Sequence, residues 1–180
     1  MNPGLYIKYI ILLLVLMIVR QVTAQTTDQA ELRTDRILLE VGNSRHEFGD
    51  YKGAIQAFTM AIEMNPELGL AYNNRGITKA TTGNDTGAIE DFTRSIEINK
   101  NYLPAYLNRA ASRYNTGDYY GAIEDYGKVI EMDPDNVIAW YGRGISHLKI
   151  RYLVGACEDL NKALDLGYDF VKELIDEHCR

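Results

Sequence analysis

One pattern occurs four times along this chain of 180 residues, at a fixed spacing of 34 residues. In every copy an alanine follows a glycine, and these alanines are Ala54, Ala88, Ala122 and Ala156. A repeat of this length corresponds to one supersecondary unit, which cannot bury its apolar face alone and therefore stacks on its neighbours. The repeat thus predicts a linear array of small units rather than a chain folded around one core.

The apolar positions within each copy are three and four residues apart, as Ala54, Ala57, Phe58 and Ala61 illustrate. This spacing places them on one face of a helix, and turn residues divide each copy into two such helices. The sequence therefore predicts antiparallel helix pairs at residues 35–48 and 52–64, 69–82 and 86–98, 103–116 and 120–132, and 137–150 and 154–166.

Other columns recur at the same period. The small column is Gly42, Gly76, Ala110 and Gly144, a large apolar column is Phe58, Phe92, Tyr126 and Leu160, and prolines recur at Pro66 and Pro134. These columns resemble the tetratricopeptide repeat (TPR) family over residues 35–170. The resemblance implies an all-α fold, a right-handed α-solenoid with TPR repeats at 35–68, 69–102, 103–136 and 137–170. Repeat four departs from the pattern, because Arg151 replaces the turn glycine.

The residues after the fourth repeat predict a C-terminal capping helix within 171–180. Apolar residues at positions 170, 171, 174 and 175 alternate with charged ones, as in an amphipathic helix that covers the apolar side of the last repeat. The two cysteines of the chain, Cys157 and Cys179, lie in repeat four and in this cap. A disulfide between them is one interpretation if the chain is exported, and a buried free Cys157 with a frayed Cys179 is the other.

An arginine column occupies a position where the TPR family usually has an apolar residue. Each arginine has an aspartate 16 residues later, whereas repeat one has Val41 and Ala57 at the two positions. Charges that are present together and absent together indicate an ion pair between the two helices of one repeat. The predicted structural pairs are Arg75–Asp91, Arg109–Asp125 and Arg143–Asp159. Binding of an acidic ligand by the basic columns is the functional alternative, which these local acidic partners disfavour.

A second charge pattern follows on the second helices. Glu90/Arg94, Glu124/Lys128 and Glu158/Lys162 are four residues apart, whereas repeat one has Gln56 and Met60 at these positions. The spacing predicts an ion pair on the exposed side of each of these helices.

The resemblance also implies that the first helices line a concave groove. The predicted partner-binding residues are Asn73, Asn74, Ile77, Leu107, Asn108, Tyr114, Tyr141, Ile145 and Leu148. Apolar anchors with amide groups suit an extended peptide or an amphipathic helix. For Ile77 and Ile145 a place in the core between repeats is an equal alternative. TPR domains that grip the carboxylates of chaperones use lysine and arginine here, and this groove has Asn73, Leu107 and Tyr141 instead.

Residues 1–24 have the pattern of a signal peptide. Lys8 precedes an unbroken apolar run at 10–19, and a Val-Thr-Ala tripeptide ends at Ala24. A membrane-spanning helix needs about 20 apolar residues, so the sequence predicts cleavage after Ala24 and a linker at 25–34. An anchor formed by residues 5–19 is the alternative. We therefore expect an exported protein, periplasmic or secreted, most simply of a bacterial cell envelope.

No catalytic arrangement is evident in the sequence. Its three histidines, His46, His147 and His178, lie in different repeats or in the cap, without the spacing of a zinc site or a catalytic triad. Removal of Lys8 and Arg20 with the signal peptide would change the formal net charge from −6 to −8, which opposes binding to nucleic acid.

The sequence as a whole favours a non-catalytic scaffold or adaptor, without metal or cofactor, that binds a protein or peptide partner in its concave groove. Two alternatives remain. One is a self-assembling structural protein of the envelope that associates through the ends of its solenoid. The other is an accessory subunit of an envelope complex, held at the membrane by an uncleaved N-terminal segment.

Overall fold

The structure is a computed structural model that describes residues 13–14, 16–21 and 34–179. Residues 34–47 are helical, and the elements that follow are α2 (Tyr51–Met64), α3 (Gly69–Thr81), α4 (Asp85–Ile98), α5 (Leu103–Thr116), α6 (Tyr119–Met132), α7 (Val137–Lys149), α8 (Leu153–Asp165), the 3-10 turn η1 (Asp169–Val171) and α9 (Lys172–His178). Each bound lies within a residue or two of the prediction.

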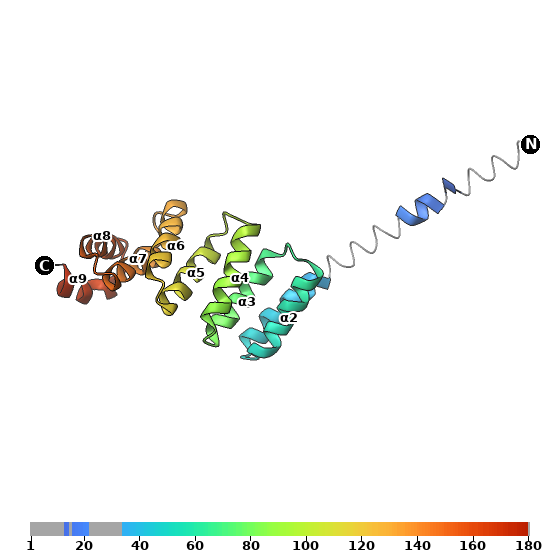
Figure 1. Cartoon of the computed structure of the whole chain (residues 1–180), viewed down its shortest axis with the longest axis horizontal. Helices are drawn as coiled ribbons and strands as arrows, with labels where there is room; N and C mark the ends of the chain where they lie inside the picture. The colour runs from blue at the N-terminus through green and yellow to red at the C-terminus, as the bar shows by residue number, and fades with distance from the viewer. Residues whose placement is uncertain (1–12, 15, 22–33, 180) are drawn as a thin grey trace, which may run out of the picture.

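The described helices form a single array of pairs. Each helix from α2 to α8 packs against the next along the chain, and α3, α5 and α7 also contact one another in order. Figure 1 shows the pairs following one another from the N-terminal repeat to α9, which lie at opposite ends of the array. The predicted all-α solenoid of helix pairs is confirmed.

The predicted N-terminal segment falls largely outside the described residues. Positions 13–14 and 16–21 are helical, and apolar side chains among them, such as Leu14 and Met17, are exposed. The cleavage point at Ala24 and residues 25–33 of the predicted linker at 25–34 lie outside the description, and residue 34 is helical. The signal peptide stays a prediction. None of the helices that the structure describes has both the length and the hydropathy to cross a membrane.

The recurring turn between the two helices of a repeat depends on a glycine and a capping side chain. Gly117 has a φ of 85°, and Oδ1 of the next residue, Asp118, accepts a hydrogen bond of 2.9 Å from the backbone N–H of Gly121. Gly83 and Asn84 repeat this arrangement. Repeat four keeps the turn without the glycine, because Arg151 itself adopts a φ of 60°.

The core of each repeat is an aromatic or large aliphatic side chain seated on a small residue. Phe58 and Phe92 are each 1% exposed, and a methyl group on Gly42 or Gly76 would collide with their rings. Leu160 packs over Gly144 in the same way. The Tyr126 ring additionally occupies the space above Gly142, which lies outside the small column in the first helix of the next repeat. The small and the large columns of the sequence are therefore two sides of one packing contact.

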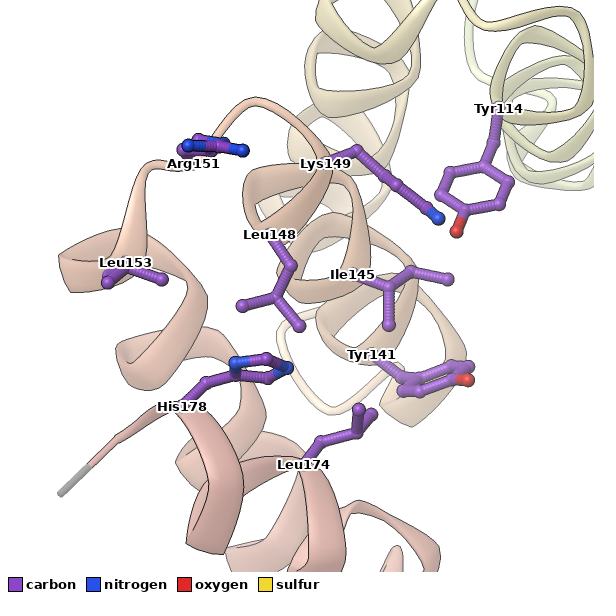
Figure 2. Close-up of a pocket in the computed structure, with 9 residues that line it drawn as sticks. All are labelled: Tyr114, Tyr141, Ile145, Leu148, Lys149, Arg151, Leu153, Leu174 and His178. Carbon is purple, nitrogen blue, oxygen red and sulfur yellow. The ribbon is translucent and has the colours of Figure 1, made fainter.

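The cap closes the C-terminal end of the array. Val171 is fully buried, and Leu174 and Ile175 pack against the cluster that contains Leu160 and Ala163. Figure 2 shows α9 beneath α7, with Leu174 and His178 directed towards it. A disulfide joins Cys157 of α8 to Cys179 just after α9, with the two Cα atoms 5.5 Å apart. Of the two interpretations of these cysteines, the structure contains the bridge.

The three Arg–Asp pairs expected from the sequence are present, each with two hydrogen bonds. In the pair between Arg109 and Asp125, Nη2 donates to Oδ1 at 2.7 Å and Nε donates to Oδ2 at 2.8 Å. Arg75–Asp91 and Arg143–Asp159 have the same geometry. Burial lowers the pKa of Arg109, but its hydrogen bonds to Asp125 and the charge of that carboxylate outweigh this effect and raise the pKa overall.

Each of these aspartates also has a second basic neighbour, which the sequence analysis did not assign. Lys79 lies 2.8 Å from Asp91 and Arg113 lies 2.9 Å from Asp125. In repeat four this position is His147, whose Nδ1 is 3.0 Å from Asp159 but is not aligned for a hydrogen bond. Each buried carboxylate is therefore shared by two residues of the first helix.

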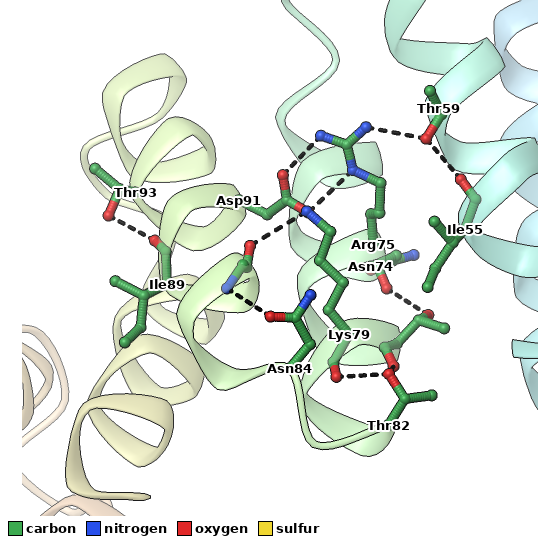
Figure 3. Close-up of polar contacts among 12 residues, drawn as sticks. Ile55, Thr59, Asn74, Arg75, Lys79, Thr82, Asn84, Ile89, Asp91 and Thr93 are labelled. Carbon is green, nitrogen blue, oxygen red and sulfur yellow. Dashed lines mark hydrogen bonds and ion pairs between the residues drawn. The ribbon is translucent and has the colours of Figure 1, made fainter. Parts of the chain in front are cut away.

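The arginines also connect adjacent repeats. Nη1 of Arg75 donates to Oγ1 of Thr59 in the preceding repeat at 3.0 Å, and Figure 3 shows this guanidinium between Thr59 and Asp91. Arg109 makes the same bond to Thr93 at 3.1 Å. The prediction of a pair within the repeat is thus correct but incomplete, because the same side chain holds the neighbouring repeat.

The exposed pairs predicted at a spacing of four residues differ from those observed. Arg94 instead pairs with Glu97 at 3.1 Å and with Glu67 of the preceding repeat at 3.0 Å. Lys128 pairs with Glu131 at 2.7 Å. Exposed ion pairs differ little in energy, so local rotamers decide among neighbouring carboxylates.

Loss of one member of the buried charge cluster is expected to cost more than loss of two. Asp125→Ala leaves Arg109 and Arg113 side by side without their shared acceptor, and should lower the free energy of unfolding by about 3 kcal/mol. Adding Arg109→Leu should recover part of this loss. Urea unfolding of both single variants and the double variant measures the coupling, with exposed Glu124→Ala as control. Additive losses would contradict the interaction.

Alkaline pH is expected to destabilise the protein through Tyr126. Burial raises the pKa of its phenol to about 12, with smaller effects of the same sign from Tyr114, Tyr141 and Asp125. The unfolded chain ionises this group near pH 10, so it binds fewer protons than the folded protein and stability falls between pH of about 10 and 12, by about 2 kcal/mol.

Urea midpoints at pH about 9 and about 11.5 test this expectation. Tyr126→Phe should lose less stability than the wild type over this interval, whereas Tyr120→Phe, which alters a tyrosine that is 73% exposed, should behave as the wild type does. Equal losses in the wild type and in Tyr126→Phe would show that other groups cause the effect.

Candidate binding cleft

A cleft of about 620 Å³ lies between α7 and the cap. Tyr141, Ile145 and Leu148 line it from one face of α7, because they are four and three residues apart. Leu174 of α9 lies opposite, as Figure 2 shows, and Tyr114 of α5 borders the cleft on the side of repeat three. The walls are thus largely apolar.

The cleft also has three basic residues, which come from three different segments. Lys149 is the last residue of α7, Arg151 lies in the turn to α8, and His178 ends α9. Among the described residues that line the cleft, none is acidic. Glu177, an exposed neighbour, lies 3.7 Å from Nε2 of His178. Basic side chains around apolar walls stand out in a chain with a formal net charge of −6.

Tyr141 provides a polar group within these walls. Its ring centroid is 5.1 Å from that of Tyr168. Burial raises the pKa of the Tyr141 phenol, with smaller contributions from Tyr168 and Tyr114. The phenol therefore keeps its proton at neutral pH and can donate a hydrogen bond to a ligand.

The structure divides the predicted groove residues among different places. Tyr114, Tyr141, Ile145 and Leu148 meet in the cleft. Asn74 and Ile77 line a separate hollow of about 240 Å³ beside repeat one, with Asn43, His46, Glu47 and Phe58. Leu107 packs with the core cluster around Ala110, and Asn73 and Asn108 lie outside both hollows.

The asparagines hydrogen-bond to one another across three repeats. The amide of Asn108 donates to Asn73 at 3.2 Å, Asn73 donates to Asn74 at 3.1 Å, and Asn74 donates to Asn43 at 2.8 Å. Asn73 is only 2% exposed. The expectation that Asn73 contacts a partner is therefore corrected: its amide is buried and serves the contact between repeats.

Comparison with known proteins agrees with this geometry. The family model described as a tetratricopeptide repeat matches residues 39–102, and a second, described as a TPR repeat, matches residues 112–150. Together the two cover more than half of the chain. The chain belongs to the tetratricopeptide repeat family.

Solved TPR structures share the fold at low sequence identity. MamA protein is 20% identical with a TM-score of 0.74, covering 77% of this chain and 76% of that one. The first TPR of Spaghetti (RPAP3) bound to HSP90 peptide SRMEEVD is 24% identical, with a TM-score of 0.65 and coverage of 66% and 94%. The Sgt2 TPR domain from Aspergillus fumigatus is 25% identical, with a TM-score of 0.61 and coverage of 65% and 79%. A comparison with curated protein sequences finds no match.

Several residues of the cleft were missed because the sequence analysis placed the TPR groove on the first helices alone. Arg151 comes from the turn before α8, Leu153 is the first residue of α8, and Leu174 and His178 come from the cap. The one available signal was the pair Cys157 and Cys179, since a bridge between them requires the cap to fold back on α8. Apolar walls, basic side chains and a phenol allow this cleft to bind a ligand through apolar contacts, charge and hydrogen bonds.

Across the described part of the TPR array, no group of three or more His, Cys, Asp or Glu side chains is placed to hold a metal ion.

The disulfide is expected to hold one wall of the cleft in place. Replacement of both residues (Cys157→Ala with Cys179→Ala) opens a loop of 22 residues and should lower the free energy of unfolding by roughly 3 kcal/mol in the chain-entropy model. Hydrogen exchange should accelerate in α9 more than in α3, which the bridge does not touch. Unchanged exchange in α9 would show that packing alone positions the cap.

Proposed function

We propose that this TPR protein is an exported, non-catalytic adaptor that holds a segment of a partner protein in the cleft between α7 and α9. The volume of about 620 Å³ is in the range of ligand sites and accommodates a few side chains of a peptide or helix. Tyr141, Leu148 and Leu174 offer contact to an apolar anchor.

The basic residues favour a particular kind of segment. Lys149, Arg151 and His178 surround the apolar walls from different sides, so an apolar side chain flanked by carboxylates would match both features. The RPAP3 neighbour was solved with the acidic peptide SRMEEVD, which supports a peptide site on this fold. In the present chain the proposed contacts lie at the C-terminal end of the array and include the cap.

The observation that carries this proposal is the backbone of Arg151. Gly49, Gly83 and Gly117 occupy its place in the other repeats with φ values of 78° to 85°, and Arg151 has a φ of 60°. A side chain in this left-handed conformation costs about 1 kcal/mol relative to glycine. Strain of this kind is typical of functional positions, and here it places a guanidinium at the cleft.

The proposal of export rests on two features. Residues 1–24 have the signal-peptide pattern, and the chain carries the Cys157–Cys179 disulfide, which persists in oxidising compartments. An adaptor of the cell envelope fits both.

Arg151→Gly should separate stability from binding. It relieves the left-handed conformation, so the free energy of unfolding in urea should rise by about 1 kcal/mol. It also removes a cation from the cleft, so capture of the partner should weaken. The measurement is affinity capture from the native host with wild type and variant as bait, read by quantitative mass spectrometry.

Two further variants used as bait show whether the partner binds in the cleft. Leu153→Glu changes an apolar residue that lines the cleft, and Ile138→Glu changes one of similar exposure, 52% against 49%, outside it. A companion reduced by Arg151→Gly and Leu153→Glu but retained by Ile138→Glu supports the proposal. A companion retained by all three baits would move the contact to another surface and contradict it.

A further inference from the structure

Repeat one differs from the others on the surface that faces the N-terminal end of the array. In repeats two to four this surface is covered by the preceding repeat. Ala71, Ala105 and Ala139 of the first helices are fully buried there. Thr78, Ser112 and Ser146, about two helical turns later, are at most 2% exposed. The equivalent residues of repeat one are Ile37 and Ser44, with Val41 in the arginine column.

Two of these three positions are apolar and exposed in repeat one. Ile37 is 54% exposed and Val41 is 38% exposed. Met60 of α2, 52% exposed, stands where repeat two has Arg94, which reaches back to Glu67 of the preceding repeat at 3.0 Å. Ile37, Val41, Ser44 and Met60 are called the N-terminal face below. A shallow hollow along the helix at 34–47, lined by Arg36, Ile37, Glu40, Val41 and Ser44, lies on this face.

The opposite end of the array is finished differently. The exposed side chains of α9 include the charged residues Lys172, Glu173 and Glu177, and the helix is tied to α8 by the disulfide. Phe170 of the preceding turn η1 is an exposed apolar residue at this end. A terminal repeat normally needs such a polar outer face to stay soluble. Repeat one has Val41 and Ala57 in place of the buried charge pair, and its apolar side chains are exposed to solvent. This exposure indicates that another molecule or segment covers the N-terminal face.

We propose that a second copy of this chain covers the N-terminal face, in a dimer with twofold symmetry. The charges at the two ends of this helix are complementary under a twofold axis, because Arg36 lies near one end of the helix at 34–47 and Glu47 near the other. Glu40, which lines the hollow, lies next to the axis and faces its own copy there. Antiparallel packing of two such helices about an axis near Val41 brings Arg36 of one copy towards Glu47 of the other, whereas parallel packing opposes like charges.

Two other ways to cover this face fit less well. Head-to-tail stacking would press Ile37 and Val41 against the charged surface of α9, which desolvates its carboxylates without partners. The nine residues at 25–33 contain only Ala30 and Leu32 as apolar residues, too few to replace a packed helix. The twofold contact is closed, so it yields dimers rather than fibres.

The expected dimer is weak, because one helix and part of a second offer less than the roughly 800 Å² per partner of a standard interface. A dissociation constant in about the micromolar range is the matching expectation. The association should weaken when apolar side chains on the face become charged, and should not depend on the cleft at the other end.

The test compares the wild type with a variant in which repeat one receives the charge pair of its neighbours. Val41→Arg with Ala57→Asp reproduces the pair of repeats two to four, and Arg45 already occupies the position of the second cation that Lys79 and Arg113 hold. The variant should therefore fold while its N-terminal face becomes polar. Ile138→Glu, on α7, is the matched control for loss of an exposed apolar residue.

The full 180-residue gene product, expressed with its N-terminal segment so that processing can occur, is studied by light scattering coupled to size exclusion over a concentration series. Wild type and Ile138→Glu should shift from monomer to dimer, and the Val41→Arg, Ala57→Asp variant should need at least tenfold more protein for the same shift. A wild type that stays monomeric, as it would if its own N-terminal segment covered the face, overturns the proposal. A dimer that the variant retains also overturns it.

A cross-link tests the symmetry separately. Under oxidation, Val41→Cys should form a disulfide between the same residue of two copies, because that residue lies near the twofold axis. Ile138→Cys should not. A dimer without this cross-link would rule out the proposed axis.

Discussion

The stacking of this solenoid depends on a buried carboxylate in each of repeats two to four, which an arginine and a second basic residue of the first helix surround. Asp125, 1% exposed, would be costly in an apolar interior without Arg109 and Arg113. Arg109 also donates to Thr93 of the preceding repeat. One arginine therefore sets the distance between the two helices of a repeat and the position of that repeat on its neighbour. Aromatic rings such as Phe92 pack on glycines such as Gly76 and fill the space between the two helices of a repeat.

The network of buried charges changes in the first and last repeats of the array. Repeat one lacks the charge pair, and within residues 34–179 no repeat precedes it. Apolar side chains are exposed on the surface that the later repeats use to contact their predecessor. Repeat four retains Arg143 and Asp159 but replaces the second cation with His147 and the turn glycine with Arg151. These departures coincide with the two surfaces on which function is proposed, the N-terminal face and the cleft.

Much of the fold was predictable because its determinants are local or periodic. Helix bounds follow from the spacing of apolar residues and from turns such as Gly117–Asp118, and these depend on neighbours in the sequence. The Arg109–Asp125 pair was also predictable, since the two charges vary together among repeats. The contact of Arg109 with Thr93 was not, because a threonine on a helix carries no signal of which neighbour it will bond.

The candidate cleft was predictable only in part, because some of its contacts join segments that are distant in the sequence. By itself the sequence determined the number of repeats, the helices, the three buried Arg–Asp pairs and the side of α7 that carries Tyr141, Ile145 and Leu148. Only the tertiary structure decided that α9 folds back beside α7, that Arg151 and His178 reach the same cleft, and that Asn73 is buried. Those facts depend on how segments distant in the sequence pack, and a period of 34 residues describes each repeat without describing the place where the repeats end.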